Sequence, residues 1–485
     1  MKLRSIAVLA AALAGLIATS APLRAQAPGR FAGIWVGTLD AGGTKLRIVF
    51  NVSTATDGSL GATMDSPDQG AKGIPVTAVT AHGDSLQIEM KSIAGVYDGK
   101  MEPGDSVLTG IWSQGGMSFP LVLKKSLTVP ELPRRPQDPK KPYPYNEEEV
   151  EYKNTEAAIT LAGTLTTPRK GGPFPAVLLI TGSGTQDRNE QIFNHRPFLV
   201  LADYLTHRGI AVLRVDDRGI GGSTGSPVTA TTRDFAGDAL AGVQYLKSRK
   251  EVNPAKIGLI GHSEGGIIAP MVAAESRDIA FIVLMAGTAL PGKVIINRQL
   301  VAIGRAQGES EASTAKFLRL NERLLDLAAV EPDSAALMKS ANALLDSVLG
   351  TLTGQEKDQF EPTLKQSRMQ LRNLVAPWTR FFLTYDPRPT LSRVTCPVLA
   401  INGENDRQVL PDENLPLIEK ALRSGGNSHV TVKKLPGLNH LFQTSETGSP
   451  NEYASIEETF SPKALSLIGD WIREQAGMRT AKQKK

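Results

Sequence analysis

Hydrophobic and polar residues alternate in short runs over roughly the first quarter of the chain. Between residues 31 and 125, runs such as Ser85–Met90 are separated by Gly, Asp, Asn and Pro. A period of two, broken at close intervals by turn residues, is typical of antiparallel strands. We therefore predict a small all-β domain, a sandwich or barrel, over residues 26–125.

Two Gly-x-Trp segments bracket this region. Trp35 lies near its start and Trp112 near its end. Large amphipathic rings in an alternating pattern more often pack in a core than bind a ligand. We expect both indoles in the core of a closed sheet whose ends pair.

Residues 126–148 interrupt the alternation. Six prolines lie there in a polar background. Such a composition favours a stiff, extended chain. We predict a linker that sets two domains apart.

From residue 149 to 478, apolar runs of strand length alternate with amphipathic runs of helix length. This alternation is typical of a mostly parallel sheet covered by helices on both faces. The predicted elements are a hairpin over residues 150–167, strands at 175–180, 210–216, 257–260, 280–285, 398–401 and 430–433, and helices at 198–208, 234–247 and 267–274.

Strand patterns stop between about residues 291 and 389, where long helical patterns such as 317–327 and 334–349 take over. An insertion at this point would lie over the carboxyl ends of the strands, which is where open α/β sheets bind ligands. We predict a helical cap over the site.

The excess of positive charge lies at the two ends of the chain. The formal net charge is +5, but residues 1–25 and 479–485 carry seven Lys and Arg and no acid, so the remainder has a net charge of −2. Because no patterned element carries a basic cluster, we expect no nucleic-acid partner.

The first 25 residues have the layout of a secretory signal peptide. Basic Lys2 and Arg4 precede the apolar run 6–18, which is followed by Ala-rich sequence. This run is shorter than the roughly 20 residues that span a membrane. We predict cleavage after Ala25, with Ala27 as the alternative, and export to the periplasm or medium with no membrane span left.

A candidate nucleophile lies where the apolar run 257–260 meets a Gly-x-Ser-x-Gly turn, Gly261-His-Ser-Glu-Gly265. A serine between a strand and a helix takes a strained backbone conformation that pushes its Oγ out over the sheet edge. Ser263 is therefore the predicted nucleophile. The amide of Glu264, at the start of the next helix, is a predicted oxyanion donor.

Four local patterns together resemble a known family. The chain from about 150 to 476 is similar to the α/β-hydrolase superfamily, and more narrowly to secreted bacterial esterases and serine-aminopeptidase-like proteins with an N-terminal β domain. The resemblance implies an α/β-hydrolase fold with a helical cap. The patterns are the serine turn 261–265, the turn Asp216-Asp-Arg-Gly-Ile-Gly-Gly-Ser223, the loop Thr181-Gly-Ser-Gly-Thr-Gln-Asp-Arg188, and the acid and histidine loops 403–409 and 435–440.

A serine nucleophile needs a base within hydrogen-bond reach and a carboxylate that orients the base. His440 follows a strand and a Pro-Gly turn, which makes it the predicted base in preference to His429. Asp406 follows the strand 398–401 by a short loop and matches the spacing of the family, so we predict it as the acid. Glu404 is the alternative.

The second oxyanion donor is expected in the loop after residue 180. Ser183 matches the family's donor, but Thr181 replaces the usual histidine, which leaves Gly184 as an alternative. Of the neighbouring side chains, His262 is expected to pack at the elbow, and the carboxylate of Glu264 to face the mouth of the site.

These residues predict an exported serine hydrolase that cleaves carboxylic esters through an acyl-enzyme, and the resemblance suggests short acyl chains. The chain lacks Cys/His clusters, a His-Glu-x-x-His pattern and a dinucleotide fingerprint, so we expect no metal or cofactor, only a small-molecule ester as partner.

Three alternatives stay open. An aminopeptidase or dipeptidyl peptidase would use the same triad and a carboxylate that holds a free amine, for which the cap offers Glu309, Glu311 and Glu322. An acyltransferase is the second. The third is an envelope ligand-binding protein whose working part is the β domain.

Overall fold

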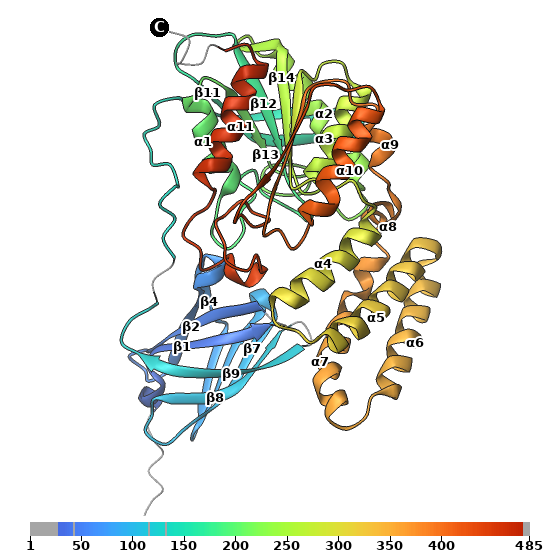
Figure 1. The fold of residues 1–485 in the computed structure, drawn as a ribbon. Helices are drawn as coiled ribbons and strands as arrows, with labels where there is room; N and C mark the ends of the chain where they lie inside the picture. Colours follow the sequence, from blue (N-terminus) through green and yellow to red (C-terminus); the bar gives the residue numbers. More distant parts are fainter. Residues whose placement is uncertain (1–27, 42–43, 115–116, 131–132, 479–485) are drawn as a thin grey trace, which may run out of the picture.

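The computed structural model describes residues 28–478 except 42–43, 115–116 and 131–132. An antiparallel sheet and a larger α/β domain follow each other along the chain (Figure 1). The predicted signal peptide, residues 1–25, lies outside the described residues. Within the described part of the chain, no helix is both long and apolar enough to cross a membrane.

The N-terminal domain is a single antiparallel sheet in the order β4-β3-β2-β1-β9-β8-β7-β6-β5. Three 3-10 helices accompany it, η1 (Pro28–Phe31), η2 (Pro67–Gln69) and η3 (Lys91–Ile93). Its strands are β1 (Gly33–Ala41), β2 (Thr44–Thr54), β3 (Leu60–Ser66), β4 (Ala71–Pro75), β5 (Ala78–His82), β6 (Ser85–Met90), β7 (Gly95–Met101), β8 (Val107–Gln114) and β9 (Met117–Ser126).

This sheet curls into a half-barrel. The first and last strands do pair, β1 with β9, and Trp35 and Trp112 are buried in the core. The order, however, begins with β4 and ends with β5, and no ladder joins these two strands in the described residues. Pro75, which has no N–H to donate, ends β4 at the opening.

The proline-rich linker runs along the second domain and bonds to it. The guanidinium of Arg135 donates to the carbonyl oxygens of Phe193, Ala454 and Ile456 at 2.8–3.0 Å. The side-chain oxygen of Gln137 accepts from two backbone N–H groups of the second domain. The linker therefore fastens to this domain as well as joining the two.

The second domain contains a mixed sheet in the order β10-β11-β13-β12-β14-β15-β16-β17. The ladders β10–β11 and β11–β13 are antiparallel, and the other ladders, from β13 through β12 to β17, are parallel. The strands are β10 (Asn146–Asn154), β11 (Ile159–Thr167), β12 (Phe174–Ile180), β13 (Ala211–Val215), β14 (Val252–His262), β15 (Phe281–Met285), β16 (Val398–Gly403) and β17 (Val430–Leu435).

Helices cover both faces of this sheet, because successive side chains of a buried strand point to opposite faces. One core contains Leu178 and Leu259 and is covered by α2, α3 and α10, and the other contains Leu179 and Ile260 and is covered by α1 and α11. The helices are α1 (Pro197–His207), α2 (Thr232–Ser248), α3 (Gly265–Glu275), α10 (Pro411–Ser424) and α11 (Pro462–Gln475), and a 3-10 turn, η4 (Pro450–Glu452), precedes α11.

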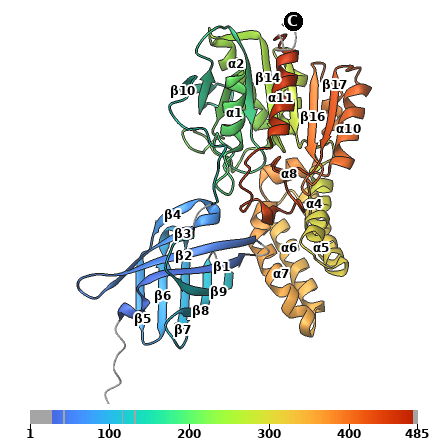
Figure 2. The same ribbon diagram turned by 60° about the vertical axis from the view of Figure 1, so that its left-hand side comes forward.

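Six helices separate β15 from β16 and form the cap. Figures 1 and 2 place the larger ones at the end of the α/β domain that also faces the half-barrel. They are α4 (Gly292–Ala306), α5 (Glu311–Val330), α6 (Ser334–Thr351), α7 (Gly354–Leu374), α8 (Pro377–Thr384) and α9 (Arg388–Leu391).

Candidate active site

Ser263 lies in the sharp turn between β14 and α3. Its φ is 53°, in the left-handed region that residues other than glycine seldom adopt. A Cβ at Gly261 would lie 1.9 Å from the carbonyl oxygen of Gly265, and a Cβ at Gly265 would lie 2.3 Å from that of Ile180. The turn can therefore form only with glycine at both positions.

Asp406 and His440 meet on the loops that follow β16 and β17. Nδ1 of His440 lies 2.7 Å from Oδ2 of Asp406, and both side chains are buried. Oδ1 of Asp406 accepts from the N–H groups of Gln408 and Val409 at 2.7 and 2.9 Å. This carboxylate is thus fixed by its own loop, and its other oxygen holds the imidazole through Nδ1, which leaves Nε2 for proton transfer.

The two alternatives from the sequence lie elsewhere. Glu404 is exposed and accepts from the N–H of Gly437 at 3.2 Å. His429 is exposed at the start of β17. Neither of them takes part in the hydrogen bond between Asp406 and His440.

His262 connects the histidine loop to the serine turn. Its Nε2 lies 3.0 Å from the carbonyl oxygen of His440, and the two rings are 4.9 Å apart. Since His262 is the residue before Ser263, this contact brings the loop of His440 beside the serine. In the described residues neither Ser263 Oγ nor His440 Nε2 has a hydrogen-bond partner, so both atoms are available for reaction.

The loop after β12 presents backbone N–H groups to the same place. The N–H of Gly182 is occupied, because it donates to Oε1 of Glu190 at 2.8 Å. The N–H groups of Ser183, Gly184 and Glu264 donate to no atom of the described residues. A Cβ built at Gly182 would lie 3.3 Å from the Cβ of Ser263, so the loop packs directly against the serine.

A family model described as the alpha/beta hydrolase family matches residues 177–455, more than half of the chain and all of the loops described above. The chain belongs to the α/β-hydrolase family. The fold class predicted from the sequence, an α/β-hydrolase domain behind a small all-β domain, is confirmed.

Several relatives of this hydrolase are known. Esterase EstD of Thermotoga maritima is 28% identical over 317 residues, which cover 64% of this chain and 65% of the esterase. An uncharacterised protein of Mycobacterium tuberculosis is 31% identical over 136 residues, 28% of this chain and 44% of that protein. The hydrolase thus matches just under two thirds of the length of the first relative and less than half of the second.

Solved structures of similar shape include the esterase Pf2001 of Pyrococcus furiosus, with 15% identity, a TM-score of 0.43 and coverage of 68% of this chain and 91% of that one. The α/β hydrolase GrgF of Penicillium sp. sh18 has 18% identity and a TM-score of 0.42, with coverage of 69% and 100%. Both likenesses are too distant to carry an argument about function.

The side chain of Glu264 corrects an expectation from the sequence, since it is buried rather than facing the mouth of the site. Its Oε1 accepts from the hydroxyl of Thr232 and from Nε1 of Trp378, both at 2.7 Å. Burial raises the pKa of this carboxyl, and the two hydrogen bonds oppose the shift. Trp378 belongs to α8, so the cap of the hydrolase is docked onto the residue next to the serine.

Asp217 holds the loop after β12 by two hydrogen bonds. Its carboxylate accepts from the hydroxyl of Thr181 at 2.8 Å and from the N–H of Gln186 at 2.9 Å. Burial raises the pKa of Asp217 to about 7, although these hydrogen bonds lower it.

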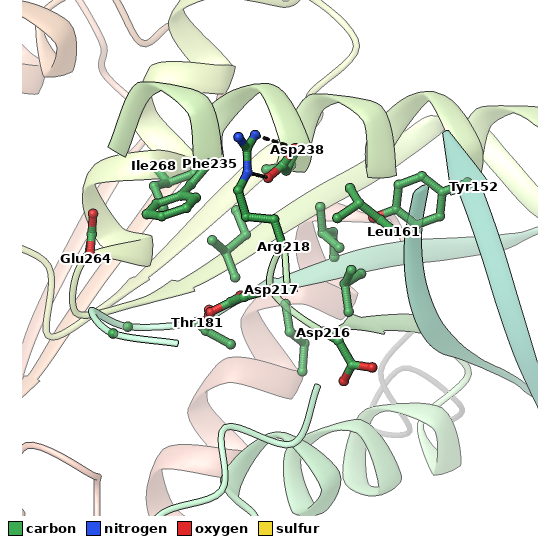
Figure 3. A pocket seen from close by; sticks show the side chains of 17 residues that line it. Tyr152, Leu161, Thr181, Asp216, Asp217, Arg218, Phe235, Asp238, Glu264 and Ile268 are labelled. Atoms are coloured by element: carbon green, nitrogen blue, oxygen red, sulfur yellow. Dashed lines mark hydrogen bonds and ion pairs between the residues drawn. The ribbon is translucent and has the colours of Figure 1, made fainter. Parts of the chain in front are cut away.

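A cavity of about 60 Å³ lies beside Asp217 (Figure 3). Asp217 and Glu264 line it together with Arg218, which pairs with Asp238, whereas Ser263 and His440 do not. The cavity therefore lies behind the loop rather than at the serine.

Glu190, Thr232 and Trp378 were missed by the sequence analysis. No motif marks them, because each acts on a partner that is distant in the sequence. In the described residues, no group of three or more His, Cys, Asp or Glu side chains is arranged to hold a metal ion.

Proposed function

We propose that this protein is an exported serine hydrolase that cleaves carboxylic esters. Ser263 is the nucleophile, His440 the general base and Asp406 the acid that orients the base. One observation carries the proposal, the position of His440. Its ring lies against Asp406, and its carbonyl oxygen lies against His262. His262 is the residue before Ser263, whose φ is 53°.

The reaction follows from these positions. Oγ of Ser263 attacks the acyl carbonyl carbon while Nε2 of His440 takes the hydroxyl proton. The N–H groups of Glu264 and Ser183 stabilise the oxyanion. The tetrahedral intermediate then expels the alcohol, which receives the proton from His440. A water molecule, deprotonated by His440, attacks the acyl-enzyme and releases the acid and the free serine.

The comparison with relatives supports ester hydrolysis in particular. The relative from Thermotoga maritima, matched over 317 residues, is named an esterase. The cap supports a bounded acyl site, because α8 contacts Glu264, and α4 reaches the acid loop through a hydrogen bond of 3.3 Å between Gln299 and Gln408. Short acyl chains and export, through the signal of residues 1–25, are parts of the same proposal.

Peptide hydrolysis has weaker support. Among the acids suggested for holding a free amine, Glu309 accepts from the hydroxyl of Ser313, and Glu311 lies exposed 3.9 Å from Arg305. Both carboxylates have partners on the cap itself, whereas Glu322 has no hydrogen bond or ion pair in the described residues.

A substrate panel tests the proposal. Chromogenic esters with acyl chains of two to about twelve carbons are compared with aminoacyl and dipeptidyl amides, using the full mature chain and Ser263→Ala as the blank. We expect turnover of the short esters only. Preferred cleavage of amides would move the protein to the peptidases, and turnover by the blank would remove Ser263 from the mechanism.

A further inference from the structure

The ring of His262 makes two hydrogen bonds, and both partners are acceptors. Nδ1 lies 2.9 Å from Oε1 of Glu190, and Nε2 lies 3.0 Å from the carbonyl oxygen of His440. A carbonyl oxygen can only accept, so Nε2 must carry a proton. An ionised carboxylate only accepts, so when Glu190 is ionised its Oε1 accepts from Nδ1 as well as from the N–H of Gly182. An imidazole that donates from both nitrogens is a cation.

The surroundings of the ring favour this charge. Burial lowers the pKa of His262, but the Glu190 carboxylate, the carbonyl oxygen of His440 and the charge of Asp406 outweigh it and hold the pKa above its ordinary value. The titratable groups that face the ring are Glu190, His440 and Asp406.

The carboxylate of Glu190 also holds the loop after β12. One oxygen, Oε1, accepts from His262 and from Gly182, the residue before the predicted oxyanion donor Ser183. The backbone of Glu190 has a φ of 51°, a strained conformation that the surrounding loop has to maintain. The carboxylate thus fixes where the loop after β12 lies relative to the serine turn.

We propose that Glu190 and His262 form a buried ion pair that positions both the general base and the oxyanion loop. His262 holds the peptide of His440 at one end, and Glu190 holds Gly182 at the other. Neither side chain has a hydrogen bond to Oγ of Ser263 or to Nε2 of His440, so both are positioning residues. This inference rests on the proposed function, since it assigns the pair to the same reaction.

His195 shows what a buried histidine does without a carboxylate. Its Nδ1 contacts the hydroxyl of Thr459, and its Nε2 lies near the carbonyl oxygen of Tyr453 and the side-chain amide of Gln443. Burial lowers the pKa of His195 to about 4, so this ring is neutral at pH 7. The charge on His262 is therefore a consequence of Glu190 and not of burial.

Kinetics test the positioning role. We expect Glu190→Gln and His262→Gln each to lower kcat about 10- to 100-fold with KM changed less than about threefold, since a misplacement of about 1 Å can cost that much. The double variant should lose no more than the worse single variant, because the two residues act as one unit. The matched control is Asp238→Asn, which breaks a buried ion pair with Arg218 away from the serine and should keep kcat within about threefold.

Wild-type kcat in Glu190→Gln, or losses that multiply in the double variant, would overturn the proposal. A loss in Asp238→Asn as large as in Glu190→Gln would do so too, because the effect would then follow from any broken ion pair.

A second readout does not depend on turnover, and its measurement on the wild type does not depend on the fold of a variant. The chain contains six histidines, and nitrogen-15 NMR of the wild-type rings distinguishes a doubly protonated ring from a neutral one. We expect one buried ring to stay doubly protonated at pH 8 and to become neutral in Glu190→Gln. A neutral His262 at pH 7 in the wild type would overturn the proposal. If no ester is hydrolysed, the proposed function fails, and the NMR spectrum still decides whether the ion pair exists.

Discussion

The half-barrel and the α/β domain bury their polar side chains in different places. In the described part of the half-barrel the buried polar residues are Asp65, Ser66 and Asp68, which lie in and beside η2, where a Cβ at Gly70 would touch Asn194 of the hydrolase domain. In the α/β domain a group of buried polar residues lies at or after the carboxyl ends of the parallel strands; it contains Thr181, Glu190, Asp216, His262, Glu264, Asn402, Asp406 and His440.

The parallel sheet therefore has buried polar side chains at the candidate site, whereas the buried side chains of the half-barrel are mostly apolar. A buried polar group costs free energy unless it is hydrogen-bonded. At the serine turn each buried ion or carboxyl has named partners: His440 for Asp406, Glu190 for His262, and Thr232 with Trp378 for Glu264. These hydrogen bonds hold the buried side chains around the serine turn in place.

The largest expected effect comes from a change in the buried polar group of the α/β domain. Asp406→Asn keeps the size of the side chain but removes the charge that orients the imidazole of His440, so kcat toward a short ester should fall about 10⁴-fold with little change in KM. Steady-state kinetics measure it. Glu404→Gln, at the exposed acid two residues away, is the control and should leave kcat unchanged; the reverse pattern would show that the acid was misassigned.

A smaller effect tests the half-barrel as a core. Trp35 is fully buried and donates from Nε1 to the carbonyl oxygen of Phe31 at 2.7 Å. Trp35→Ala should lower the free energy of unfolding by about 3–5 kcal/mol, as measured with urea, and leave kcat unchanged. Phe281→Ala, a comparable change on β15 beside the serine strand, should lower both quantities. A fall in kcat for folded Trp35→Ala would mean that the half-barrel is coupled to the site.

The smallest effect concerns the contact between the cap and the serine turn. Trp378→Phe replaces the indole that stacks on Phe382 with a smaller aromatic ring and removes the N–H that donates to Glu264. Thr232 still donates to this carboxyl, so we expect a loss of about 1–3 kcal/mol in stability. KM should rise a few-fold while kcat stays nearly constant, because the cap shapes binding. An unchanged KM would show that the cap is held by other contacts.

Local sequence pattern was sufficient to predict the strands and the order of the candidate site residues along the chain. Apolar runs marked β12 to β16, because buried parallel strands have no polar face. The Gly-x-Ser-x-Gly turn marked the serine through its need for glycine at 261 and 265. The loops of Asp406 and His440 could be predicted because each comes shortly after a predicted strand, β16 or β17.

Contacts between distant segments were beyond the sequence. Glu190 and His262 are 72 residues apart, and Glu264 and Trp378 are 114 residues apart. Nothing local marks such partners, because they are selected by how loops meet at the sheet edge. Alternation has a similar limit, because it predicts strands and their faces but not whether the two edge strands of a sheet join.

The central claim is that Ser263 is the nucleophile of an ester hydrolase. Turnover of a short-chain ester by the purified mature chain, beside Ser263→Ala of equal fold by circular dichroism, tests it most directly. The account predicts a fall of about 10⁶-fold in kcat for the variant. Turnover by Ser263→Ala within tenfold of the wild type would contradict it.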